Sequence, residues 1–191
     1  MWKKIALSLL GLALLAAVAL FAFLQYMKGA ASDPAFFESE IVAFEAQDAA
    51  QPPAPGGVAF VGSSSIRFWD SLTEDMAPAP VIQRGFGGAQ MSHVLHNVHR
   101  VVTPYAPSRV VVYAGDNDLA AGSEKTAETV VAQYRELIKE IHSRVPKAKI
   151  DFIAIKPSTP RWAQWHEMKR ANQRIAAPAT TSTDSPERSV S

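Results

Sequence analysis

The chain has 191 residues, a formal net charge of +1 and no cysteine. This length allows one ordinary domain together with a membrane element, and the near-zero charge gives no sign of the basic surface that nucleic-acid binding requires. Without cysteine, the chain has no disulfide, no thiolate metal site and no lipoprotein cysteine.

The first predicted element is a hydrophobic helix near the N-terminus. Lys3 and Lys4 precede an uncharged apolar run over residues 5–24. About twenty helical residues span roughly 30 Å, the hydrocarbon core of a bilayer. We therefore expect a transmembrane signal-anchor within residues 1–28, with the N-terminus in the cytoplasm and an exported (periplasmic or extracellular) domain. Two alternatives remain open: a signal peptide cleaved near residues 29–31, which gives a secreted form, and a buried soluble helix.

A juxtamembrane segment is expected over residues 29–57. Asp33 and Pro34 are typical of a helix N-cap and first helical position. Apolar residues then recur at helical spacing: Phe36, Phe37, Ile41 and Phe44. The Pro- and Gly-rich stretch over residues 51–57 predicts the end of this helix and a linker.

Residues 58–175 alternate between apolar strands and helical stretches and form the predicted domain. Strands are expected at 58–61, from 81, at 109–114 and at 150–155, and helices at about 92–102, 124–144 and 162–175. Runs of β-branched residues indicate strands buried on both faces. This alternation predicts an α/β fold with a parallel, doubly wound sheet, in which ligands bind at the carboxyl ends of strands. The composition of residues 176–191 predicts a disordered tail.

Three Gly-rich turns follow predicted strands, and the first contains Ser64. A nucleophilic serine for acyl transfer needs a sharp turn after a strand, which Gly62 and the neighbouring small residues allow. The alternative is that these serines cap the following helix. Ser63 and Ser65 leave the choice of nucleophile open.

The other two turns offer hydrogen-bond donors. Backbone N–H groups in Gly85–Gly88 can face a developing oxyanion, although the glycines also suit a tight connection that needs positive φ. Within Gly115–Asp118, the Asn117 side chain can supply another donor, or it can form an Asx turn or helix cap. Together the three turns indicate acyl transfer more strongly than any one does.

The segments 60–65, 84–88 and 115–118, in this order and spacing, resemble the first three blocks of the SGNH, or GDSL-type, hydrolases. The resemblance covers about residues 35–175. It implies a three-layer α/β/α flavodoxin-like fold and ester hydrolysis without a metal or organic cofactor. Similar proteins act on lipid esters, thioesters and O-acetylated sugars, so a small-molecule or glycan ester substrate is expected.

The resemblance also implies roles for individual residues. Ser64 would be the nucleophile and would donate its own N–H to the oxyanion, together with the Gly88 N–H and the Asn117 side chain. Ser63 and Gln83 stand where the family usually has Asp and Asn, and neither position is a nucleophile or base.

One departure from the family is serious. The family's last block is Asp-x-x-His, in which His is the general base, and no Asp in this sequence lies three positions before a His. No strand is predicted after the last helix either. We therefore expect a C-terminally truncated or altered member with impaired activity. The alternative is a non-catalytic, membrane-tethered binding module that retains the cleft.

Other residues offer little support for a substitute site. His93, His96 and His99 drift around their helix by about 60° per step, which indicates a solvated face rather than a metal site. His142 and His166 are expected on helix surfaces. The loop at 156–160 lies on the active-site side and could shape a pocket. Both Trp162 and Trp165 are expected to pack inside, and the alternative is that they form a platform for the substrate.

Overall fold

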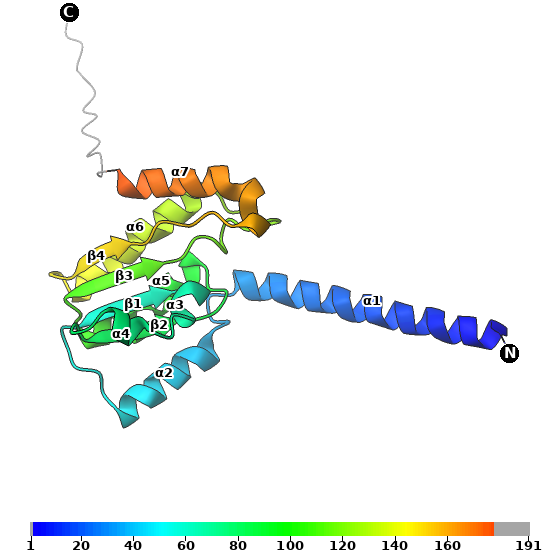
Figure 1. Cartoon of the computed structure of the whole chain (residues 1–191), viewed down its shortest axis with the longest axis horizontal. Coiled ribbons are helices and arrows are strands. Elements are labelled where there is room, and N and C mark those ends of the chain that lie inside the picture. The colour runs from blue at the N-terminus through cyan, green and yellow to red at the C-terminus, as the bar shows by residue number, and fades with distance from the viewer. Residues whose placement is uncertain (1, 178–191) are drawn as a thin grey trace, which may run out of the picture.

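The computed structural model describes residues 2–177, which form an α/β domain and a long helix that projects from it (Figure 1). In chain order the elements are α1 (Trp2–Ser32), α2 (Glu38–Ala50), β1 (Val58–Gly62), α3 (Ser64–Arg67), α4 (Leu72–Asp75), β2 (Val81–Gly85), α5 (Met91–Val101), η1 (Thr103–Tyr105), β3 (Arg109–Tyr113), α6 (Ala127–Arg144), β4 (Lys149–Phe152), η2 (Thr159–Gln164) and α7 (Trp165–Ala176).

The strands form one parallel sheet in the order β2-β1-β3-β4. Gly62, the last residue of β1, pairs with Gly85 of β2 and with Tyr113 of β3. These three strands therefore end at the same edge, which we call the carboxyl edge. The strand order reverses between β1 and β3, and in such sheets ligands bind at that reversal. The predicted parallel, doubly wound fold is confirmed.

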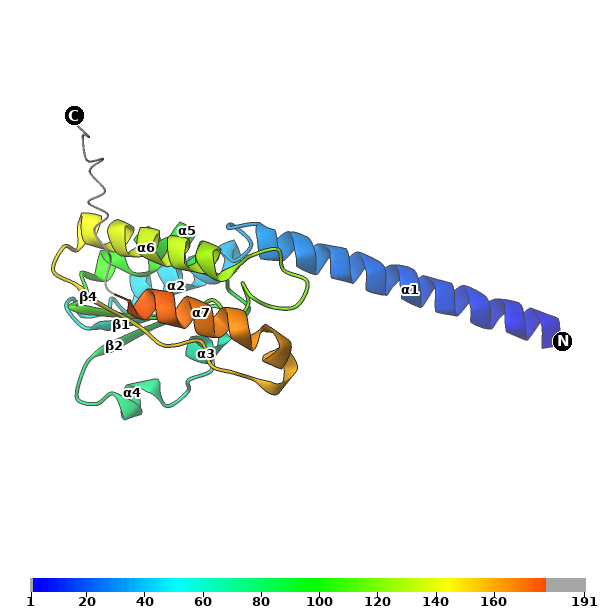
Figure 2. The ribbon, with the colours of Figure 1, turned by 90° about the horizontal axis from the view of Figure 1, so that it is seen from above.

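Side chains of the central strands alternate between two cores, as the period of a strand requires. Ala59 and Val61 of β1 face a large core shared with α2, α5 and α6, whereas Phe60 faces a smaller core shared with α3 and α4. Met168 of α7 joins the large core because α7 packs along α6. The result is the three-layer α/β/α arrangement, with one thin layer of two short helices (Figure 2).

Strand β4 differs from the prediction in length and burial. It ends at Phe152 rather than at 155, and in the described part of the chain it pairs with β3 alone. Lys149 and Asp151 are exposed, so the expectation of a strand buried on both faces is wrong for β4. Successive residues of a strand point to opposite faces of the sheet, so Lys149 and Asp151 share the exposed face of β4, whereas Ile150 and Phe152 pack against the large core on the other face.

Helix α2 begins at Glu38 and not at Asp33-Pro34 as predicted. Asp33 directly follows α1, and its Oδ1 accepts a hydrogen bond from the Ala35 N–H at 2.9 Å, which forms a local turn instead of a helix cap. The predicted apolar face is confirmed, since Phe37 and Ile41 are buried.

Helix α1 holds one candidate membrane span among the described residues, Leu9–Tyr26, with a mean hydropathy of 2.2 and none of its length buried. Both views show α1 projecting away from the domain (Figures 1 and 2). A membrane anchor and a signal sequence share these properties. The predicted tail from 178 onward lies outside the described residues.

Candidate active site

Ser64 lies at the carboxyl end of β1, as the first residue of α3. The turn before it requires glycine: Gly62 has φ +149°, and a Cβ there would lie 1.9 Å from the Tyr113 carbonyl oxygen. The Ser63 N–H donates to the same oxygen at 2.9 Å. The backbone thus turns sharply against β3 and leaves Ser64 half-buried at the sheet edge, the strand–turn–helix setting of an acyl-transfer nucleophile.

The three consecutive serines have different environments. Ser63 is fully buried, and its Oγ neither caps α3 nor has another partner among the described residues. The Ser65 Oγ accepts a hydrogen bond from Lys156 Nζ at 3.3 Å. The Ser64 hydroxyl makes no hydrogen bond within residues 2–177. Of the three, Ser64 therefore offers an accessible and unengaged hydroxyl.

Backbone donors lie in the first and second loops. Gly88 has φ +87°, and a Cβ there would have no neighbour within 4 Å, so the loop faces open space. The N–H groups of Ser64 and Gly88 donate no hydrogen bond within the described residues. Both are available to an anion at the carboxyl edge.

The third loop brings Asn117 to the second loop. Asn117 Nδ2 donates to the Ala89 carbonyl oxygen at 3.0 Å, while Asn117 Oδ1 accepts from Arg161 Nη2 at 2.7 Å. Arg161 also pairs with Asp116 Oδ2 at 2.6 Å. Because a carboxamide has two N–H donors, one remains beside the bond to Ala89. Arg161 fixes which end of the amide faces the second loop.

Sequence reasoning missed Arg161, because nothing in the pattern links η2 to a loop 44 residues earlier. It also missed a buried network behind the site. Asp118, fully buried, accepts from the Met91 N–H at 2.9 Å and pairs with Lys125 Nζ at 3.4 Å. Lys125 Nζ also donates to Gln90 Oε1 at 2.6 Å.

This network fixes the start of α5, and hence the second loop, against the third. Burial raises the pKa of Asp118, and the charge of Lys125 opposes that increase. The network therefore holds a carboxylate at the N-terminus of a helix, where its charge is favourable.

The histidines lie on helices, and none of them makes a hydrogen bond with Ser64 within the described residues. His93 is buried, so its predicted position on a solvated face is wrong: Nδ1 accepts from the Gln90 N–H at 2.9 Å, and Nε2 lies 3.0 Å from the Asp33 carbonyl oxygen. His99 Nε2 lies 2.7 Å from a Glu140 oxygen. Exposed positions are occupied by His96, His142 and His166. None of the histidines therefore acts as a base toward Ser64 in this arrangement, and no group of side chains within residues 2–177 is suited to hold a metal ion.

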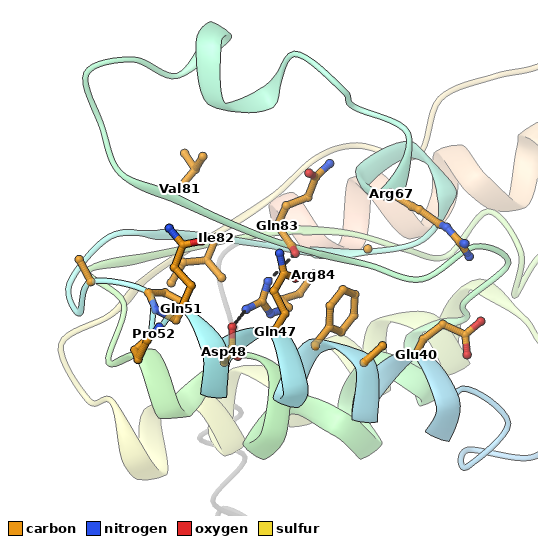
Figure 3. A pocket seen from close by; sticks show the side chains of 15 residues that line it. Glu40, Gln47, Asp48, Gln51, Pro52, Arg67, Val81, Ile82, Gln83 and Arg84 are labelled. Atoms are coloured by element: carbon orange, nitrogen blue, oxygen red, sulfur yellow. Dashed lines mark hydrogen bonds and ion pairs between the residues drawn. The ribbon is translucent and has the colours of Figure 1, made fainter.

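A cavity of about 640 Å³ lies beside the site, between α2 and β2 (Figure 3). Its lining includes Arg67 and Gly85 near the carboxyl edge but excludes Ser64. Arg84 points into it, pairs with Asp48, and lies about 5 Å from two aromatic rings. These contacts join α2 to the sheet, and they do not bring a nucleophile or base into the cavity.

The chain is similar to known proteins both in sequence pattern and in fold. The model of the GDSL-like lipase/acylhydrolase family matches residues 54–184. A Streptococcus pneumonia protein provisionally described as a platelet activating factor superposes with a TM-score of 0.63 at 16% identity, covering 82% of this chain and 73% of that chain.

Two further structures share the fold. A GDSL-like lipase from Bacteroides thetaiotaomicron has a TM-score of 0.61 at 18% identity and covers 71% of this chain and 70% of its own. An acetyl xylan esterase, AlAXEase, has a TM-score of 0.50 at 18% identity and covers 62% and 71%. No curated protein matches the chain significantly.

Proposed function

Because the chain belongs to the GDSL-like lipase/acylhydrolase family, we propose that its carboxyl edge is a serine ester hydrolase site. The Ser64 oxygen forms a bond to the acyl carbon, and the resulting oxyanion accepts hydrogen bonds from the N–H groups of Ser64 and Gly88 and from Asn117 Nδ2. The carbonyl then re-forms, the alcohol leaves, and water releases the acyl group from Ser64.

The observation that carries this proposal is the arrangement of the three loops. They leave adjacent strands, Asn117 is bonded to Ala89, and the backbone N–H groups of Ser64 and Gly88 are unengaged within the described residues. No step in this scheme uses a metal or an organic cofactor. The substrate class is a small-molecule or glycan ester, and an acetyl xylan esterase among the structural neighbours fits the glycan branch of that class.

The proposed location is a membrane. Helix α1 anchors the chain in a single span, Lys3 and Lys4 keep the N-terminus in the cytoplasm, and the domain is exported. Cleavage after the span would give a secreted form of the same domain.

The proposed activity is weak, because the nucleophile lacks a recognisable base. As the Ser64 oxygen attacks, a base must take the hydroxyl proton and later return it to the leaving alkoxide. The sequence has no Asp-x-x-His, and the described residues bring no histidine to Ser64. Without a positioned base, water takes that proton, and the oxyanion donors alone leave residual catalysis.

The same observation favours one alternative, a membrane-tethered module that binds esters in the cleft without hydrolysing them. The two functions differ in turnover. We would measure hydrolysis of short-chain 4-nitrophenyl esters by the full-length chain in detergent. Ser64→Ala is the test variant. Ser71→Ala is the matched control, at an exposed serine that directly precedes α4.

Slow turnover that disappears in Ser64→Ala and persists in Ser71→Ala supports the hydrolase. Turnover that survives Ser64→Ala contradicts the nucleophile assignment. Saturable binding of an ester with no turnover above the Ser64→Ala level would favour the binding module.

A further inference from the structure

The proposed anchor and the candidate site lie on the same side of the domain. Asp33, the residue after α1, contacts His93 near the start of α5 through its carbonyl oxygen at 3.0 Å. Phe37 packs on Phe86 of the second loop, with ring centroids 5.1 Å apart. Since α5 begins just after the second loop, α1 ends at the carboxyl edge. Figures 1 and 2 show α1 leaving the domain at the end where α7 begins.

The separation between span and domain is short. The candidate span ends at Tyr26, and α1 continues without a break to Ser32. Six further helical residues rise about 9 Å. The polar layer on each side of a bilayer is roughly 5–8 Å thick. Tyr26 also contacts Phe36, with ring centroids 6.0 Å apart, so the carboxyl edge is held near the depth of the headgroups.

Exposed apolar side chains gather at this same edge. Outside α1, the described residues include four exposed large apolar side chains, and three of them lie in the connections that follow β1 and β4: Phe68 (70% exposed), Ile153 (37%) and Trp162 (64%, within η2). The prediction that Trp162 packs inside is therefore wrong, whereas Trp165 does pack against the large core. The fourth, Val42, lies on α2.

Two cations accompany these side chains. The Arg67 guanidinium lies 5.8 Å from the Phe68 ring centroid, and Lys156 bonds to Ser65, next to Ser64. Neither cation has a carboxylate partner within residues 2–177. Exposed aromatic rings beside unpaired Lys or Arg are the residue types that settle at membrane interfaces, the rings among the headgroups and the cations on lipid phosphates.

We propose that the carboxyl edge is a membrane-contacting surface formed by Phe68, Ile153, Trp162, Arg67 and Lys156. It rests on the proposed anchor and deepens the proposed function. The surface lies on the leaflet from which α1 emerges, so the Ser64 site opens onto the headgroup layer. Its substrate is then an ester presented by a lipid-anchored molecule in that leaflet, rather than a freely soluble one.

Site-directed labelling tests this surface directly, because the natural chain has no cysteine. Single variants Phe68→Cys, Trp162→Cys and Ile153→Cys would carry a nitroxide label in the full-length chain, reconstituted in vesicles of phosphatidylcholine and phosphatidylglycerol. Lys147→Cys, exposed in the turn before β4 at the opposite edge, is the matched control. Leu15→Cys, within the candidate span, gives the reference value for a label surrounded by lipid.

Spin relaxation by oxygen, which concentrates in lipid, is compared with relaxation by a water-soluble nickel chelate. We expect the ratio of oxygen to chelate relaxation at positions 68, 153 and 162 to lie between the high ratio at 15 and the low ratio at 147, as it does for a label among the headgroups. A ratio equal to that at 147 at all three positions would overturn the proposal, as would shielding from both reagents, which indicates a protein partner. A water-exposed label at position 15 would overturn it by removing the anchor.

The readout requires no turnover, so its failure is separate from failure of the hydrolase proposal. A second variant tests the cations: Arg67→Gln combined with Lys156→Gln, in chains labelled at position 162. Adding phosphatidylglycerol to phosphatidylcholine vesicles should increase the oxygen accessibility of this label in the parent, and much less in the double variant. An equal increase in both chains would exclude these cations from the surface.

Discussion

Asn117 donates a side-chain N–H to the main-chain oxygen of Ala89 at 3.0 Å, and so joins the third loop to the second. Arg161 holds the other end of the same amide at 2.7 Å. The bond between Asn117 and Ala89 spans 28 positions of the chain and joins the loop of one candidate oxyanion donor, Asn117, to the loop of another, Gly88.

Asn117→Ala should reduce ester hydrolysis to the level of Ser64→Ala. Loss of one oxyanion donor costs about 100- to 1,000-fold in kcat, and the expected turnover is already weak. The measurement is the initial rate with a 4-nitrophenyl ester, with the urea unfolding midpoint as a check on folding. Unchanged hydrolysis in a folded Asn117→Ala chain would remove Asn117 from the site.

Gly62→Ala should destabilise the domain severely, whereas Gly122→Ala should not. A Cβ on Gly62 would lie 1.9 Å from the Tyr113 carbonyl oxygen, but Gly122, at φ +79°, has no neighbour within 4 Å. At Gly122 only the left-handed backbone is penalised, by about 1–2 kcal/mol. Soluble yield and urea midpoints compare the two. A Gly62→Ala chain as stable as Gly122→Ala would show that β1 and β3 are further apart here than the structure places them.

These loops also show where sequence reasoning succeeds. Gly62 and Ser64 could be placed at a strand end from the local sequence alone. A run of β-branched residues indicates a strand, and a glycine after it indicates a backbone turn that other residues rarely adopt. Contacts between distant side chains carry no such local signal, so Arg161 was missed and His93 was assigned to solvent. The exposed face of β4 was likewise missed, because Lys149 and Asp151 alternate with Ile150 and Phe152, which do pack against the large core.

Asp48→Ala should destabilise the domain by about 3 kcal/mol, near the low end for breaking a buried pair. Arg84 is 6% exposed and Asp48 19% exposed in their ion pair, so removing Asp48 leaves a guanidinium largely buried without its carboxylate. Glu136→Ala, which breaks the exposed pair with Lys139, is the control and should change stability by less than about 0.5 kcal/mol. Equal losses of unfolding free energy from the two substitutions, measured in urea, would show that the pair of Arg84 and Asp48 is solvated.

Arg100→Gln should alter the acid dependence of stability. Hydrogen bonds from Arg100 lower the pKa of both Glu38 and Glu45 from the ordinary value of 4.5. Carboxyl groups with a lowered folded-state pKa stabilise the fold above the unfolded pKa, and this contribution is lost as the pH falls through the folded value.

The natural chain should therefore unfold at a higher urea concentration than Arg100→Gln at neutral pH. This difference in urea midpoint should disappear below about pH 4.5. Arg144→Gln, at an exposed arginine on α6, is the control and should follow the natural chain throughout. A gap that persists unchanged into acid would mean that Arg100 acts through packing rather than through these carboxylates.

The central claim is that Ser64 is an ester-hydrolase nucleophile without a positioned base, and added imidazole tests it most directly. Imidazole can diffuse to a half-buried serine and accept its proton. After subtraction of the rate with Ser64→Ala at each concentration, hydrolysis by the natural chain should be slow without imidazole and should rise as imidazole is added. Rates identical to Ser64→Ala at every concentration would contradict the nucleophile, and fast, imidazole-independent hydrolysis that needs Ser64 would contradict the missing base.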